Sequence, residues 1–531
     1  ASSNTTITDG GKNGHYTEAR AYNTQTYGDV MVNINKTFGD DWSLNANIGA
    51  SINNIKTDEL SYRGPIQENG LPNVFNVFDL DDTKKRAEKT GWHDQTQSLF
   101  ASVEVGWRQM LYLTVTGRND WASQLANSPS SSFFYPSVGL SWVPTSTWDL
   151  GEALSYLKIR GSIASVGMPF PRHLTIPTYE YDATNRVWKD KTHYPIGDLK
   201  PERTTTYEVG LDARLWQRIS LSASWYQADT KNQTFDPSLP PSSSYTTIYL
   251  QTGHVRNTGV ELSAGYDNQW RDFRWATNFT YSWNRNEIIE LAANAVNPVT
   301  GEPLNLNKLD IKGLGKAKYI LKEGGTLGDL YTTSDLRFND NGYIEVDKNG
   351  NLLLTDEGDD IYLGSVFPDH NLAWRNDFSW KSINLGVLFT ARIGGICYSA
   401  TQANMDLYGV SEASAAARDA GGVWINGREL VDAQKWYQAI GSQSGLPQYY
   451  TYSATNIRLQ ELSLGYTLPA KWFRDKMRMT VSFVGRNLWM IYCKAPFDPE
   501  AVASTGLNYQ GIDYFMMPSL RSLGFNVKFQ F

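Results

Sequence analysis

Leu523-Gly524-Phe525-Asn526-Val527-Lys528-Phe529-Gln530-Phe531 closes the chain and indicates its fold. The odd positions are apolar, whereas the even positions are small or polar. This period of two is typical of a strand with one face in an apolar medium and the other in a polar one. A terminal strand with three Phe on one face would aggregate in water unless its edges were paired. A transmembrane barrel accounts for such an ending, because its outer face meets lipid and its closure removes the edges.

The composition of the 531-residue chain agrees with a membrane barrel. Aromatic residues make up 13% of the chain, with 30 Tyr and 18 Trp, but hydrophobic residues reach only 41%. No apolar run is long enough for a membrane helix, whereas alternating strands with aromatic girdles fit both numbers. The net charge of −7 argues against a nucleic-acid partner, since phosphate binding needs a basic face.

The two Cys, Cys397 and Cys493, are too few for a disulfide framework or a zinc cluster. We expect two unpaired thiols, with a single bridge as the alternative. Residues 1–14 are polar and glycine-rich, without the basic start and apolar centre of a secretory signal. For an outer-membrane protein, we therefore expect the chain to be a mature or internal piece.

Alternating segments recur along the whole chain, and we predict about 15 antiparallel strands. In the thirteenth, Leu459 and Leu462 lie in opposite phases, which predicts a β-bulge near Gln460 and Glu461. The predicted strands lie at residues 26–36, 42–52, 99–107, 111–115, 134–143, 157–166, 207–211, 219–225, 260–264, 273–283, 372–380, 383–393, 457–466, 477–483 and 520–531.

Short and long connections alternate between these strands. Antiparallel transmembrane barrels have short turns on the periplasmic side and long loops outside, which a soluble sandwich has no reason to follow. The sequence thus predicts one all-β membrane domain over residues 1–531. Its long extracellular loops are predicted at about 57–93, 167–202, 230–253, 288–371, 396–450 and 494–518.

The odd number of predicted strands indicates that these strands do not form a whole barrel. The last strand follows a long loop and must run from the outside to the periplasm, and with an odd count the first strand runs the same way. Bacterial single-chain barrels have an even number of strands and both ends in the periplasm. We therefore expect the C-terminal part of a larger barrel, whose other strands are on a separate polypeptide or were removed at an exposed loop.

Several motifs in order resemble the SusC/RagA-like TonB-dependent transporters of the outer membrane of Bacteroidetes-type bacteria. The resemblance covers most of residues 118–531, although Asn257-Thr258 replaces the commoner Asn-Lys or Asn-Arg. The matching stretches are Tyr135-Pro136-Ser137-Val138-Gly139-Leu140-Ser141-Trp142, Leu157-Lys158-Ile159-Arg160-Gly161-Ser162, Asn257-Thr258-Gly259-Val260-Glu261-Leu262, residues 459–469, Arg486-Asn487-Leu488, Phe497-Asp498-Pro499-Glu500, Gly511-Ile512-Asp513, Pro518 and Gly524-Phe525-Asn526-Val527.

The resemblance implies a 22-strand barrel filled by an N-terminal plug domain. It also implies nutrient uptake: import of oligosaccharides or oligopeptides under a SusD-like surface lipoprotein, powered by the TonB complex through the plug. No segment here resembles the plug, so we expect the plug and about seven strands to be elsewhere or missing, and this chain alone not to transport. The alternative is a structural or adhesive outer-membrane barrel without transport.

The motif residues Asn487, Asp498, Pro499, Glu500 and Asp513 are candidate functional positions. The carboxylates of Asp498 and Glu500 could fix the last long loop or contact the lipoprotein. The alternative is a turn, in which Asp caps the backbone and Pro fixes φ.

A calcium site is a second candidate, because hard cations take clustered carboxylate and carbonyl oxygens. The candidate ligands are Asp347, Asn349, Asn351 and Asp356 in an extracellular loop. The glycine is misplaced for an EF-hand loop, so a type I′ hairpin at Asn349-Gly350 is the competing interpretation. We expect no other cofactor.

Enzymatic activity has little support in the sequence. Glycoside hydrolysis needs two carboxyls roughly 5 to 10 Å apart on opposite sides of a bond. Asp359 with Asp360, or Asp498 with Glu500, are loop neighbours of the kind that is usually solvated. No nucleophile elbow, zinc-binding helix motif or phosphate loop occurs. We therefore predict that the chain is not an enzyme.

Ligand contacts, if this part makes them, are predicted from loop aromatics at the mouth of the lumen, since aromatic faces stack on sugar rings and amides. For each of them, the alternative is the interfacial girdle or the core of a loop. The candidates are Trp188, Tyr194, Tyr245, Tyr249, Trp424, Trp436, Tyr449 and Tyr450.

Overall fold

The structure is a computed structural model, and it is built around one long antiparallel sheet. Fifteen strands of the described chain pair in sequence order. They are β1 (His15–Phe38), β2 (Trp42–Pro65), β3 (Arg86–Trp107), β4 (Leu111–Ala122), β5 (Phe133–Trp142), β6 (Leu154–Met168), β10 (Glu202–Leu215), β11 (Ile219–Phe235), β13 (Leu250–Trp270), β14 (Phe273–Glu290), β19 (His370–Trp380), β20 (Ile383–Ile393), β25 (Asn456–Thr467), β26 (Arg478–Cys493) and β28 (Ser522–Gln530). The described residues are 13–69, 74–175, 179–182, 186–190, 193–194, 199–235, 247–248, 250–291, 307–355, 358–504, 506 and 509–531.

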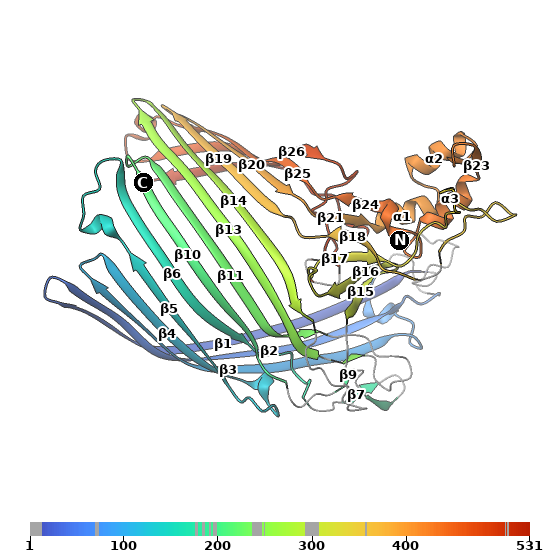
Figure 1. Cartoon of the computed structure of the whole chain (residues 1–531), viewed down its shortest axis with the longest axis horizontal. Helices are drawn as coiled ribbons and strands as arrows, with labels where there is room; N and C mark the ends of the chain where they lie inside the picture. The colour runs from blue at the N-terminus through green and yellow to red at the C-terminus, as the bar shows by residue number, and fades with distance from the viewer. Residues whose placement is uncertain are drawn as a thin grey trace.

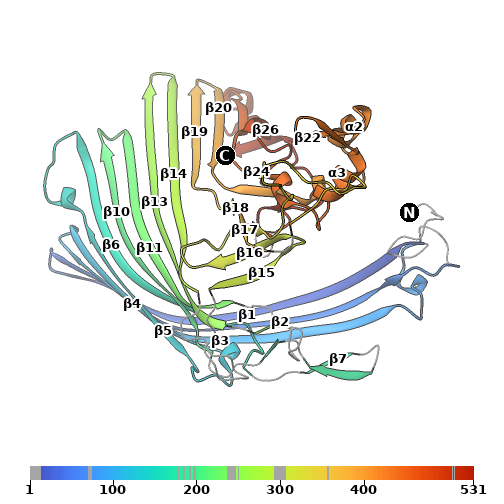
Figure 2. The same cartoon turned by 45° about the vertical axis from the view of Figure 1, so that its right-hand side comes forward.

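The sheet is curved and open, as Figures 1 and 2 show. Within the described residues, its edge strands β1 and β28 each pair on one side only, so these residues do not close a barrel. Every segment predicted by alternation overlaps one of the fifteen strands, and the antiparallel all-β fold is confirmed.

The two faces of the sheet have opposite chemistry. Val30 faces Ala50, which in turn faces Leu99, and the side chains of this row project from an apolar face on which Leu99, in a strand paired on both sides, is 55% exposed. On the other side, the polar face, Ser98 is 4% exposed and Asp120 is 7% exposed. Exposed apolar and buried polar side chains invert the pattern of a soluble protein, and a membrane barrel requires this inversion.

Several strands extend beyond the predicted ends. β2 continues to Pro65 and β3 begins at Arg86, so the loop predicted at 57–93 is shorter than expected. In these extensions polar residues occupy both faces, so the sequence has no period-two signal to detect.

The predicted bulge in β25 is confirmed. Leu388 of β20 pairs with Glu461 and Phe389 pairs with Leu459, which leaves Gln460 as the extra residue. Because the bulge shifts the phase by one, both halves of the strand keep their apolar residues on the apolar face.

Short and long connections lie at opposite ends of the sheet. The short ends carry residues 39–41, 108–110, 143–153, 216–218, 271–272, 381–382 and 468–477. The longest connections, at residues 66–85, 169–201, 291–369, 394–455 and 494–521, all leave the other ends of the strands. Their placement outside the cell stays a prediction.

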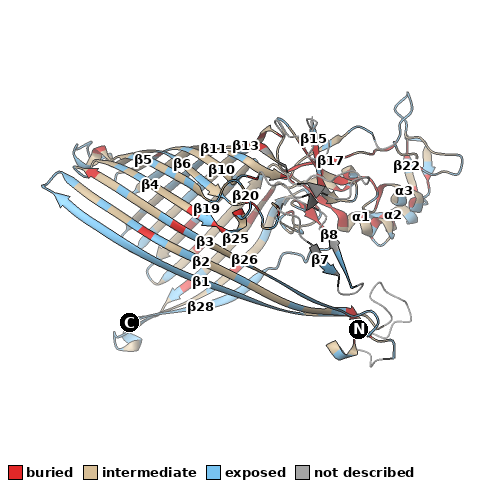
Figure 3. Ribbon diagram, turned by 90° about the horizontal axis from the view of Figure 1, so that it is seen from below, coloured by how far each residue is buried: buried red, intermediate tan, exposed pale blue. Residues whose placement is uncertain are grey.

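The long connections after β14, β20 and β26 fold together, and we call their described residues the loop assembly. It contains a four-stranded sheet of β15 (Lys308–Leu314), β16 (Ala317–Lys322), β17 (Asp329–Thr332) and β18 (Ile361–Ser365). It also contains β21 (Ile396–Ser399), α1 (Ala400–Leu407), α2 (Glu412–Asp419), β22 (Val423–Ile425), β23 (Glu429–Val431), α3 (Ala433–Ile440), β24 (Thr451–Ser453) and β27 (Ile512–Asp513). One hydrophobic cluster, including Tyr319, Tyr398 and Tyr450, joins these elements to the ends of β11, β13 and β14. Figure 3 shows buried residues gathered there.

Smaller elements occur in other long connections. They are β7 (Tyr179–Asp182), β8 (Val187–Asp190), β9 (His193–Tyr194) and β12 (Thr247–Ile248). Among the described residues, the helices are all too short or too polar to cross a membrane.

Candidate functional site

Interlocked charges line the polar face. Arg160 of β6 lies between two acids of β10: its Nη1 is 2.7 Å from Asp212 Oδ2 and its Nη2 is 3.2 Å from Glu208 Oε1. The guanidinium covers Gly210, where an added Cβ would lie 2.6 Å from Arg160 Cζ. Glycine is therefore needed at this position for the arginine to reach both carboxylates.

A second charged group spans β19, β25 and β26. Arg375 pairs with Asp377 at 2.8 Å and with Glu461 at 3.6 Å, and Glu461 also accepts from Arg486 at 3.0 Å. Between them on β20 lies Gly386, whose added Cβ would meet the Asp377 carboxylate at 3.1 Å. The atom nearest to this added Cβ would be Ser463 Oγ at 2.5 Å, so Gly386 leaves room for the Ser463 hydroxyl and the Asp377 carboxylate.

A third group lies toward the long-loop end of the sheet. Arg118 donates to Asp120 Oδ1 at 2.7 Å and to Ser98 Oγ at 2.7 Å, and Tyr135 Oη donates to Asp120 Oδ2 at 2.6 Å. All three groups are paired within the wall. They make a hydrophilic, hydrogen-bonding surface suited to polar cargo or to a polar protein surface, and they provide no activated nucleophile.

The carboxylates of the 498–500 motif are held by an arginine that the sequence argument missed. Arg458 on β25 is 5% exposed at its side chain, and its Nη2 lies 3.0 Å from Asp498 and 3.1 Å from Glu500. Asn456 Oδ1 accepts from Arg458 Nε at 3.1 Å. Burial alone would raise the pKa of Asp498, but hydrogen bonds from Arg458 and Ser519 outweigh it and lower that pKa.

This geometry favours the anchoring role over a free carboxylate surface. Asp498 Oδ1 also accepts from the Glu500 backbone N–H at 3.0 Å, so the predicted capping turn is present alongside the ion pair. Pro499 between them is buried. The motif therefore fastens the last long loop to the wall of the sheet.

The other two motif residues make connections of the same kind. Asn487 has a φ of +51° within the irregular pairing of β26 and β25, a conformation that Asn accepts more readily than most residues. Its Nδ2 donates to the Leu520 carbonyl at 3.4 Å. Asp513 is buried and accepts from Ser399 Oγ at 2.7 Å, where β27 pairs with β21.

Among the predicted ligand-binding aromatics whose side chains the structure describes, Trp188 and Trp424 are the most exposed. Trp188 is 69% exposed and packs against Tyr181 with ring centroids 5.2 Å apart. Trp424 is 65% exposed on the β22–β23 hairpin. Tyr194 lies in β9. Tyr245 and Tyr249 lie outside the described residues.

The remaining three aromatics belong to the loop assembly. Trp436 packs against its core and meets the Tyr449 ring edge to face, with centroids 6.1 Å apart. Tyr450 is 2% exposed and donates to the buried Asp406 carboxylate at 2.9 Å. Burial raises the pKa of Tyr450 far above its ordinary value. The prediction that Tyr450 contacts a ligand is wrong, because its ring and hydroxyl are both used inside the loop core.

The candidate calcium ligands form a turn instead of an open cage. Asp347 Oδ1 accepts from the backbone N–H groups of Asn349 and Asn351, each at 2.8 Å, and these bonds to Asn351 lower the pKa of Asp347. Of the hairpin tip, only Gly350 has a positive φ, so the predicted type I′ turn is wrong and a type I turn with a left-handed glycine replaces it. Asp356 lies outside the described residues, within which no three metal-ligating side chains cluster.

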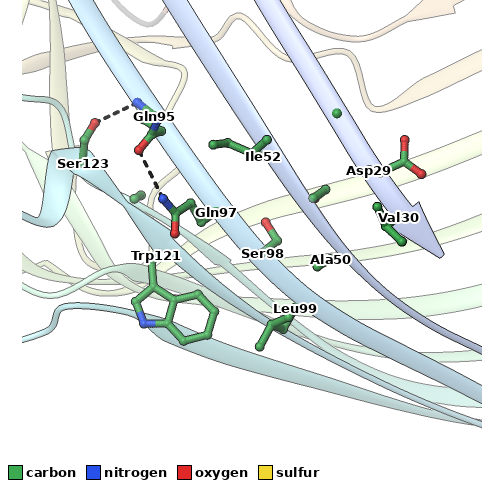
Figure 4. A pocket seen from close by; sticks show the side chains of 13 residues that line it. Asp29, Val30, Ala50, Ile52, Gln95, Gln97, Ser98, Leu99, Trp121 and Ser123 are labelled. Atoms are coloured by element: carbon green, nitrogen blue, oxygen red, sulfur yellow. Dashed lines mark hydrogen bonds between the residues drawn. The ribbon is translucent and has the colours of Figure 1, made fainter. Parts of the chain in front are cut away.

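A cavity beside the Arg118 group is lined by residues from both faces of the sheet, including Ser98. It has a volume of about 1070 Å³ and opens on the apolar face, where Val30, Ile52, Leu99 and Trp121 line it (Figure 4). Gln95, Gln97 and Ser123 bond to one another at its border. Because this face meets lipid in a barrel, the cavity is no candidate for a polar cargo.

Comparison with known proteins agrees with this architecture. The family model described as TonB dependent receptor-like, beta-barrel, matches residues 1–488. The chain is 24% identical over 560 residues to TonB-dependent receptor P3 of Formosa agariphila, covering 95% of this chain and 52% of that protein. It is 22% identical to TonB-dependent receptor SusC of Bacteroides thetaiotaomicron, covering 71% of this chain and 38% of that protein.

Solved structures show the same fold. The RagAB peptide transporter superposes with a TM-score of 0.72 at 19% identity, covering 97% of this chain and 56% of that chain. The chain spans about half the length of two TonB-dependent receptors of Formosa agariphila, P3 and P39, that it matches. The resemblance drawn from the sequence motifs is confirmed, and the chain belongs to the TonB-dependent receptor β-barrel family of outer-membrane proteins.

Proposed function

We propose that this chain forms the C-terminal part of the barrel of an active importer of oligosaccharides or oligopeptides. In this proposal other strands complete a 22-strand barrel and a plug domain fills it. A SusD-like surface lipoprotein covers its outer mouth, and the TonB complex supplies energy through the plug. Members of the family are transporters and not enzymes.

The observation that carries the proposal is the pairing of an exposed apolar face with a charged polar face on the same fifteen strands. The apolar face suits lipid, while the ion-paired arginines suit a wet lumen with a polar plug or cargo. A purely structural barrel needs the first face but does not need arginine–carboxylate pairs that connect several strands on the second.

The peptide class follows the name of a similar structure, whereas the oligosaccharide class follows the resemblance of the sequence motifs to SusC/RagA-like transporters. SusC is a TonB-dependent receptor and RagAB is a peptide transporter by name. Both classes present hydroxyl or amide groups that the polar face and loop aromatics such as Trp424 can hydrogen-bond or stack against.

The first experiment is purification of the native complex through a tag in the exposed hairpin at Gly350, with mass spectrometry of the co-purifying chains. We expect a polypeptide that carries the plug and a surface lipoprotein. A complex in which neither is present, and whose lumen is sealed, would favour the structural or adhesive alternative.

The second experiment measures uptake of labelled oligosaccharides and oligopeptides by cells with and without this chain. One class should enter only when the chain is present and only when the proton-motive force is intact. Surface binding that persists without entry, or entry that survives collapse of the proton-motive force, would contradict the proposal.

A further inference from the structure

Four short turns on neighbouring hairpins of the sheet are rich in basic residues. They join β10 to β11, β13 to β14, β19 to β20 and β25 to β26, which follow one another in the sheet. Two acids, Asp272 and Asp475, accompany six basic residues. We call these six the basic rim: Arg218, Arg271, Lys381, Lys471, Arg474 and Lys476.

The charge is confined to this half of the rim. The turns at 39–41, 108–110 and 143–153 contain one basic residue, Arg108, which pairs with Asp41 at 2.9 Å. They also contain three further acids, Asp40, Asp149 and Glu152. By contrast, no residue of the basic rim forms an ion pair within the described residues. The rim cations are therefore free to meet an external anion.

The backbone at these turns favours smaller residues than those present. Arg271, Lys381 and Arg474 have positive φ values of +53°, +52° and +56°. Trp216 and Gln217 are also in the left-handed region, with φ values of +48° and +55°. Gly, Asn or Asp adopt this left-handed region with less strain. The same conformation occurs at Arg108 and Gln109, so it belongs to the tight hairpin turns in general and holds the side chains at their tips.

Exposed indole rings lie beside the cations. Trp216, Trp270, Trp380 and Trp472 are 57%, 47%, 55% and 69% exposed. The Lys381 ammonium lies 5.5 Å from the centre of the Trp380 ring. Trp belongs at the boundary between acyl chains and headgroups, so a cation one residue further along the chain lies at headgroup level.

We propose that the basic rim binds the phosphate groups of anionic phospholipids in the leaflet that the short turns reach. The exposed Trp rings hold the turns at the depth of the headgroups, and the unpaired cations select negatively charged ones. The inference rests on the chain spanning a bilayer and not on what it imports.

The test uses the complete native complex in bilayers of phosphatidylcholine with added phosphatidylglycerol. Brominated forms of each lipid quench Trp fluorescence on contact, so their relative quenching gives the preference for the anionic headgroup. We expect brominated phosphatidylglycerol to quench more strongly at low salt, and the difference to vanish near 1 M salt.

A variant removes four rim cations together: Arg218→Gln, Arg271→Gln, Lys381→Gln and Arg474→Gln. The preference of the complex for phosphatidylglycerol should fall by about fivefold for each replaced cation that contacts a lipid phosphate. The matched control removes four exposed cations at the long-loop end: Arg20→Gln, Lys84→Gln, Lys89→Gln and Lys348→Gln.

Equal quenching by both lipids, or an equal loss in the control variant, would overturn the proposal. So would retention of the complex on cell-wall sacculi through the rim with no lipid preference. The rim variant should still import cargo, which separates failure of this inference from failure of the import proposal.

Discussion

Replacing Arg458 by Met is the most informative perturbation of the loop anchor. The substitution keeps the volume of the side chain but leaves the Asp498 carboxylate, 9% exposed, without its cation. Loss of one partner of a buried pair costs about 3–5 kcal/mol. Glu500 is 37% exposed, and its share of the loss is small because water screens it.

We expect the last long loop to detach from the wall in this variant. A cost of that size raises the open population roughly a hundredfold or more. Limited proteolysis of intact cells reports that population, because detachment exposes the buried backbone around Pro499 to an external protease and increases cleavage there. Adding Asp498→Asn removes the unpaired charge and should recover part of the protection.

The pH dependence has a defined sign. Because the folded pKa of Asp498 lies below its ordinary value of 3.8, the ion pair contributes its stability above that value. The contribution is lost as pH falls through the folded pKa, so protection should hold at neutral pH and weaken below about pH 4.

The matched control is Arg20→Met. Arg20 forms an ion pair with Glu18, and the Arg20 side chain is 71% exposed. Loss of this ion pair should change the free energy of unfolding by less than about 1 kcal/mol. Arg458→Met cells that resist protease as well as Arg20→Met cells would refute the anchoring argument.

Three further predictions concern the sheet and the thiols. Gly210→Val should displace Arg160 from its two acids and destabilise the sheet by about 1–3 kcal/mol, measured by thermal unfolding of the complex in detergent. Phe525→Arg places a cation on the apolar face and should cost about 2–4 kcal/mol if this position lies at the bilayer midplane, measured by urea unfolding in lipid vesicles. Burial raises the pKa of the Cys397 thiol to about 12, so it should react with maleimide at neutral pH far more slowly than Cys493, as scored by mass spectrometry.

Each of these has its own control. Gly524→Val, where the structure has open space around the added atom, should be tolerated better than Gly210→Val. Asn526→Arg on the polar face should cost less than Phe525→Arg, and equal costs would contradict the assignment of faces. Maleimide reacting with Cys397 as fast as with Cys493 in the folded complex would contradict its burial.

The strands were predictable because each one separates two media. In β28 the apolar Phe525 and Val527 alternate with Asn526 and Lys528, and the same rule located the other fourteen strands and the bulge at Gln460. Alternation of apolar and polar residues is absent where both faces of a strand are polar. The sequence therefore predicts a loop where β2 and β3 in fact continue.

The contacts of the loops were not predictable in the same way. Arg458 meets Asp498 across 40 residues of chain, and Tyr450 meets Asp406 across 44. No local period marks such pairs, so Tyr450 had the same signal as an exposed aromatic like Trp424. The available clue was Arg458 itself, because a charged residue within a predicted membrane strand needs an acidic partner.

In the proposed barrel, lipid contacts one face of the sheet and water contacts the other. Spin labels placed singly at residues 523–530 of the complex in bilayers measure this directly through their accessibility to oxygen and to a water-soluble nickel reagent. The account predicts oxygen accessibility at the odd positions and nickel accessibility at the even ones, with a period of two. Equal accessibility of both reagents along the strand, or the opposite phase, would contradict it.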